Sequence, residues 1–101
     1  MSSTSDILSN ILNEFRTNGF SQVTGYNRFG YIRETDSAVI VTRETGKDTR
    51  IPFVKIEQAI EAVKNDPSVY NAGPGSLRKH GITHINSPIW SLLHLVSLSK
   101  Y

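Results

Sequence analysis

The stretch Thr49–Lys64, TRIPFVKIEQAIEAVK, decides the fold because two different periods of apolar residues meet in it. Ile51 and Phe53 alternate as they would on one face of a strand that closes a small sheet. Apolar residues then recur at the spacing of one helix face, namely Ile56, Ala59, Ile60 and Val63. Pro52 fixes its own φ and cannot donate to a ladder, so the switch falls there. A strand that runs directly into an amphipathic helix predicts an α+β fold.

A first amphipathic helix is predicted over residues 5–18. Its apolar side chains share one face and come from Ile7, Leu8, Ile11, Leu12 and Phe15. Thr4 or Ser5 is expected to cap its start. Gly19 is expected to end the helix in the left-handed conformation and to bring Phe20 into contact with Phe15.

Between these two helices the sequence predicts an antiparallel meander of three strands. The candidate strands are rich in β-branched or aromatic residues and cover 23–26, 29–34, 38–43 and 49–53. The first two segments are either one strand bent at Arg28 or two separate pieces, the first of which would be a fourth segment. Short antiparallel strands with one polar face need a cover on the other face, so we expect the helices to pack on one side of the sheet.

After Pro67 we expect a loop, one helical turn at 76–80 and a final helix. Ser87 at the cap and Pro88 at the first helical position predict that this helix runs from Pro88 to about Leu98. Its polar residues form only a narrow stripe, made of Ser91, His94 and Ser97.

So apolar a helix needs cover on both sides, and a chain of 101 residues leaves little to supply it. We therefore expect a homodimer or a protein partner that covers the final helix. The residues expected at this interface are Trp90, Leu93 and His94.

The composition indicates a single α+β domain over residues 1–101, with residues 1–4 as a flexible start. Hydrophobic residues make up 38% of the chain and charged residues 20%, which suits one modest core. The chain has no cysteine, so disulfides and thiolate metal sites are excluded. It has no long apolar run and no leader pattern, so we expect a cytoplasmic protein without a membrane segment or a cofactor.

The net charge is only +2, and the one clear bias is in residues 67–101, which hold no acid. In this segment a glycine-rich loop opens a short helical turn, where backbone N–H groups and side chains can face an anion. The candidate nucleic-acid contacts in this loop are Ser76, Arg78, Lys79 and His80. The alternative is a tight connection that needs glycine for its backbone angles.

Basic and aromatic residues of the sheet form a second candidate region. Its arginines are Arg28, Arg33, Arg43 and Arg50, with Tyr26 and Tyr31 among them. Arginines contact phosphates and aromatic rings stack on bases, so this mixture suits a nucleic acid. The alternative is that neighbouring acids such as Glu34 and Asp48 neutralise the arginines as cross-strand pairs.

Neither metal binding nor catalysis is expected. The histidines His80, His84 and His94 have no cysteine and no nearby acid in the sequence to complete a zinc site. Ser76 lies near two of them but lacks a positioned acid, and the chain has no nucleophile elbow.

The order helix, three strands, helix resembles the topology of double-stranded RNA-binding domains. The resemblance covers element order alone, because the second helix opens Val54-Lys55-Ile56-Glu57 and lacks the lysine-rich start that such domains place on phosphates. The leading hypothesis is a small non-enzymatic module that binds nucleic acid through the 73–80 loop, with the sheet arginines as secondary contacts. The alternative is a protein-interaction or accessory subunit that works through the apolar C-terminal helix.

Overall fold

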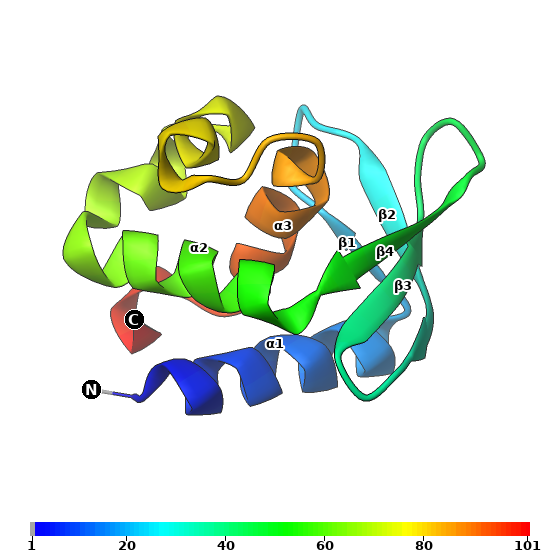
Figure 1. Cartoon of the computed structure of the whole chain (residues 1–101), viewed down its shortest axis with the longest axis horizontal. Coiled ribbons are helices and arrows are strands. Elements are labelled where there is room, and N and C mark those ends of the chain that lie inside the picture. The colour runs from blue at the N-terminus through cyan, green and yellow to red at the C-terminus, as the bar shows by residue number, and fades with distance from the viewer. Residues whose placement is uncertain (1) are drawn as a thin grey trace.

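The computed structural model describes residues 2–101 and has the predicted α+β class, with helices on one side of an antiparallel sheet (Figure 1). The sheet has four strands rather than three, and their order β1-β2-β3-β4 is that of a meander. In chain order the elements are α1 (Thr4–Asn18), β1 (Phe20–Gln22), β2 (Arg28–Glu34), β3 (Ala38–Thr42), β4 (Asp48–Pro52), α2 (Phe53–Asn65), the 3₁₀ helices η1 (Pro67–Asn71) and η2 (Pro74–His80), α3 (Asn86–Leu93) and the 3₁₀ helix η3 (Leu98–Lys100).

The switch from strand to helix occurs where the two periods meet. β4 ends at Pro52, whose φ of −62° and ψ of 137° are extended, and α2 begins at Phe53. The helix ends at Asn65, and Pro67 then opens η1. The predicted bounds of this unit are therefore confirmed to within a residue, because proline restricts the backbone at both places.

The first helix begins slightly earlier than predicted. Its N-cap is Ser3, not Thr4 or Ser5, and the Ser3 hydroxyl accepts a hydrogen bond from the Asp6 amide at 3.1 Å. Gly19 ends the helix with a φ of 82°, as predicted. Residues 1–4 were predicted to be flexible. Of these, Thr4 already belongs to α1 and Ser2 accepts a hydrogen bond from the Lys64 side chain at 3.2 Å, while residue 1 lies outside the described range.

The first strand is not where the sequence placed it. Residues 23–26 form the turn after β1, in which the Tyr26 amide donates to the Val23 carbonyl and Gly25 has a φ of 89°. β1 instead follows Gly19 directly and pairs with β2. The inward residue of this strand is Ser21, which is buried and hydrogen-bonded to Ser91 of α3 at 2.7 Å. A serine in an inward position leaves no apolar alternation to detect.

The core lies between one face of the sheet and the helices. Its members from the sheet include Val39, Val41 and Ile51, and its members from the helices include Ile7, Ile11, Phe15, Ile56, Ile60, Val63, Ile89 and Leu92. All of these side chains are buried. Because one face of the sheet supplies the core and carries all the helices, the opposite face is left without a helix (Figure 1).

The last helix differs most from its prediction. α3 starts at Asn86 rather than Pro88 and ends at Leu93 rather than near Leu98. It lies against α1, α2, β1 and η2. The chain then folds back, and the Tyr101 hydroxyl donates to the Leu93 carbonyl at 2.6 Å.

One chain therefore buries this helix on every side. Trp90 is 4% exposed and donates from its indole nitrogen to the Val69 carbonyl at 3.1 Å, and Leu93 is fully buried. The inference that the helix needs a partner is wrong, because a helix of eight residues presents far less surface than the predicted one. Trp90 and Leu93 form core rather than an exposed interface, so the expected homodimer loses its basis.

The substitution Trp90→Ala should lower the free energy of unfolding by about 3–5 kcal/mol, because it empties a core site and leaves the Val69 carbonyl without its donor. Urea denaturation measures the loss, and light scattering should give a monomer for both proteins. Val54→Ala is the control, since Val54 is 60% exposed and its truncation should change stability by no more than about 0.5 kcal/mol. A Trp90→Ala protein that keeps its stability but halves its mass would show an interface instead.

Candidate nucleic-acid interface

The face of the sheet that points away from the helices is called the outer face here, and the strand register defines it. Val39 and Val41 of β3 point into the core, so Ile40 between them points outward. Ile40 is paired with Arg33 of β2 on one side and with Arg50 of β4 on the other. Both arginines therefore lie on the outer face, and both are exposed.

A β-bulge in β2 is what turns Arg33 outward. The register shifts between Tyr31, which is paired with Val41, and Arg33. Strict alternation from Tyr31 would put Arg33 on the core side and Glu34 on the outer face. The extra residue reverses both positions, so that Glu34 is paired with Val39 on the core side.

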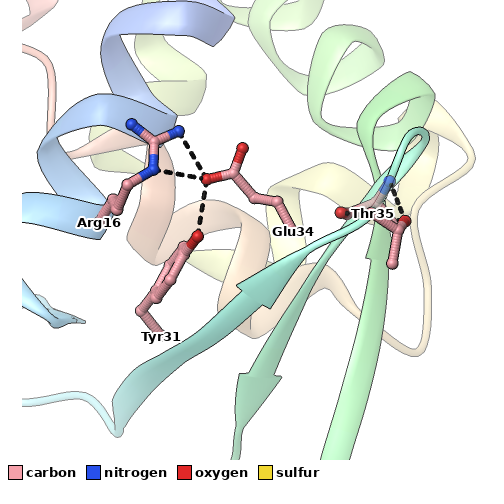
Figure 2. Close-up of polar contacts among 5 residues, drawn as sticks. Arg16, Tyr31, Glu34 and Thr35 are labelled. Carbon is pink, nitrogen blue, oxygen red and sulfur yellow. Dashed lines mark hydrogen bonds and ion pairs between the residues drawn. The ribbon is translucent and has the colours of Figure 1, made fainter.

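Glu34 is consequently bound by Arg16 and Tyr31, away from the outer face (Figure 2). One of its carboxylate oxygens accepts hydrogen bonds from Nε and Nη2 of Arg16 at 2.9 and 2.6 Å and from the Tyr31 hydroxyl at 2.8 Å. The pKa of Tyr31 is raised, first by burial and then by this bond to the carboxylate. The cluster ties the last turn of α1 to the sheet and removes the acid that sequence reasoning placed beside the arginines.

The other end of the outer face carries a third arginine and an aromatic ring. Ser21 points inward, so its neighbour Phe20 points outward, where it is paired with Gly30. The guanidinium carbon of Arg28 lies 4.0 Å from the centroid of the Phe20 ring. Phe20 is 36% exposed, so the predicted position against Phe15 is wrong. The sequence feature that could have shown this is Ser21. Because this small side chain points inward, its two neighbours in the strand point outward.

These three arginines have no acidic partner. The ion pairs within residues 2–101 are Arg16 with Glu34 at 2.6 Å and Arg43 with Glu44 at 4.0 Å. By register the acid on the outer face is Asp48, which is paired with Thr42. The alternative that cross-strand acids neutralise the sheet arginines is therefore not supported for Arg28, Arg33 or Arg50.

The fourth predicted arginine and the tyrosines lie elsewhere. Arg43 donates from Nη1 to the His84 carbonyl at 3.1 Å and so ties the β3–β4 hairpin to the loop before α3. Tyr26 packs on Trp90, with ring centroids 4.9 Å apart. Tyr31 is bound to Glu34 on the core side. The structure thus brings together three of the four arginines with Phe20 and neither of the two tyrosines.

The glycine-rich loop is largely a structural connection. Gly73 is buried with a φ of 90°, and the Ser76 hydroxyl donates to the Gly73 carbonyl at 2.7 Å. Leu77 is fully buried, while Arg78 and Lys79 are exposed. This segment packs on α2 and α3 and not on the sheet, as its place among the helices shows (Figure 1). The loop and the sheet arginines therefore do not form one surface.

The charge of this loop is also partly balanced. The pKa of Asp66 is lowered, mainly by hydrogen bonds from Ser68 and to a smaller extent by the positive charge of Lys79. Within residues 2–101, the Nε2 atom of His80 is buried without a hydrogen-bond partner.

A groove of about 460 Å³ runs beside α2 and is open to solvent. Its lining residues are Val54, Glu57, Gln58, Glu61, Ala62, Asn65 and His80. The histidine and the two glutamates of this lining can exchange protons, and the Thr4 hydroxyl donates a hydrogen bond to Glu61. No cluster of three or more metal-ligating side chains occurs in the described part of the chain.

His94, predicted at an interface, closes the end of α3 instead. Its ring stacks on Tyr70 at 3.9 Å, and its Nε2 donates to the Tyr70 carbonyl at 2.6 Å. Burial lowers the pKa of His94, against a smaller opposing effect of this hydrogen bond. The neutral imidazole is therefore the form that the fold favours.

Stability should fall as His94 is protonated. Its folded-state pKa lies below the unfolded value of about 6.5, so the unfolded chain binds more protons and the loss begins as pH falls through that value. Urea denaturation between about pH 7 and pH 5 should show this slope in the wild type and in His84→Gln, whose side chain is exposed. The slope should be reduced in His94→Gln. An unchanged slope in that variant would mean that another group causes it.

No known protein family, curated protein or solved structure matches this chain. None of the helices within residues 2–101 is long and apolar enough to span a bilayer. The outer face of the sheet and the 73–80 loop are therefore the features that bear on function.

Proposed function

We propose that this protein is a non-enzymatic module that binds nucleic acid on the outer face of its sheet. The observation that supports this most is a set of three exposed arginines, Arg28, Arg33 and Arg50, which within residues 2–101 have no acidic partner and lie on the side of the sheet without a helix. Contacts of arginine and lysine with phosphates supply a large share of the affinity of proteins for nucleic acids.

The spacing of the arginines suits a polyanion. Arg33 and Arg50 stand two strands apart across Ile40, which corresponds to roughly 10 Å at about 4.8 Å per strand. Arg28 lies five positions before Arg33 in β2, and because one of these is the bulge, four register steps of about 3.3 Å separate the two by roughly 13 Å. A nucleic-acid strand carries a phosphate about every 3.4 Å along its helix axis, so the area spans several phosphates.

Two of the three arginines are also held in place. Arg50 donates from Nη2 to the Ser37 hydroxyl at 2.9 Å, and Arg28 is held over the Phe20 ring. Ile40 between Arg33 and Arg50 is only 8% exposed although it points outward, which is consistent with cover by the aliphatic stems of its neighbours. Side chains that are already ordered lose less entropy when a ligand binds.

The protein-interaction hypothesis has less support. It relied on an exposed apolar face of the final helix, and that helix is buried within its own chain. The 73–80 loop remains a competing nucleic-acid site, because Arg78 and Lys79 are exposed.

Two charge-matched double variants separate the sheet from the loop. Arg33→Gln with Arg50→Gln removes two cations from the outer face, and Arg78→Gln with Lys79→Gln removes two from the loop. Labelled oligonucleotides titrated at several salt concentrations should bind the wild type and the loop variant alike. The sheet variant should bind more weakly, and its log–log salt slope should be smaller by about 1.4 to 1.8 if both arginines contact phosphates.

The opposite pattern would assign binding to the loop. Absence of binding to DNA and RNA even at low salt would reject the proposed function, because a phosphate-binding surface is strongest there.

A further inference from the structure

We infer that the ligand of the outer face is single-stranded and that one of its bases stacks on the pair formed by Phe20 and Arg28. This inference rests on the proposed function and specifies the form of nucleic acid that the sheet takes.

The stacking site combines a flat ring with a guanidinium group. Phe20 stands on the edge strand β1 with 36% of its surface exposed, although a ring of this size is usually buried. Arg28 lies over one side of the ring at 4.0 Å. Both groups present planar surfaces on which unpaired bases stack, and the arginine adds a positive charge beside the strand.

Gly30, the neighbour of Phe20 on β2, has no side chain and is covered by Thr42. Gly30 is paired with Phe20 on one side and with Thr42 on the other, all pointing outward. A Cβ atom at position 30 would lie 2.6 Å from the Thr42 hydroxyl oxygen, which accepts the Gly30 amide at 3.0 Å. The Thr42 hydroxyl therefore occupies the space over Gly30, and the Phe20 ring is the flat group that this row offers to a base.

A duplex cannot use these features. Its bases are paired and stacked inside the helix, so a sheet face would meet only its phosphates. An intact duplex therefore has no unpaired base to stack on the Phe20 ring or on the Arg28 guanidinium. A single strand can place phosphates on Arg33 and Arg50 and a base on Phe20 at the same time.

The test compares one labelled oligonucleotide of mixed sequence, as DNA and as RNA, with its own blunt-ended duplex. We expect the wild type to bind the single strand at least about fivefold more tightly than the duplex, the value of one stacked base at the lower end. Phe20→Leu should remove at least about fivefold of single-strand affinity and leave the salt slope unchanged, because no charge is lost. The single strand that binds with the higher affinity shows whether the protein prefers DNA or RNA.

Tyr26→Leu is the matched control. Tyr26 is an aromatic residue with 46% exposure that lies against Trp90, away from the outer face, so its loss should leave affinity unchanged. Circular dichroism should show that both variants are folded.

Equal binding of duplex and single strand, with no effect of Phe20→Leu, would overturn this inference while the proposed function stands. Binding to neither form would overturn both.

Discussion

Burial of α3 inside its own chain is the constraint on which the rest of the structure depends. The helix carries Trp90 and three large aliphatic side chains, and it can be covered only if α1, α2 and η2 gather around it on one side of the sheet. In that arrangement the helices pack against the inner face of the sheet. The outer face then has no helix within residues 2–101 to cover it, and its exposed positions are held by arginines, an aspartate, a glutamine, a threonine and a partly exposed phenylalanine. The charged surface is therefore a consequence of how the core is closed.

Much of the fold could be predicted from the sequence because its boundaries are set by residues with few backbone choices. Pro52 and Pro67 fix the start and end of α2, and Gly19 fixes the end of α1. The bounds of β1 and α3 could not be found in this way. β1 has a buried serine as its inward residue, and α3 ends where long-range contacts, such as the bond from Tyr101 to Leu93, stabilise a turn.

The candidate site shows a sharper limit of sequence reasoning. The residue types were sufficient to single out Arg28, Arg33 and Arg50. Whether an acid lies beside them on the outer face depends on one extra residue in β2. The bulge turns Arg33 outward and Glu34 inward, where Arg16 binds it. Period-2 alternation predicts the opposite arrangement and hence a neutral surface. In the same way, the loop at 73–80 has the composition of an anion site, but Ser76 is bound to its own loop and Leu77 packs in the core.

The most direct test of the account is the set of backbone amide NMR resonances that shift when a single-stranded oligonucleotide is added to the wild-type protein. The account predicts that the shifts concentrate in β1, β2 and β4, around Phe20, Arg28, Arg33 and Arg50, while residues 74–80 stay unchanged. Shifts confined to 74–80, or to the groove beside α2, would contradict it, because the sheet face would then be a solvated surface and not the binding site.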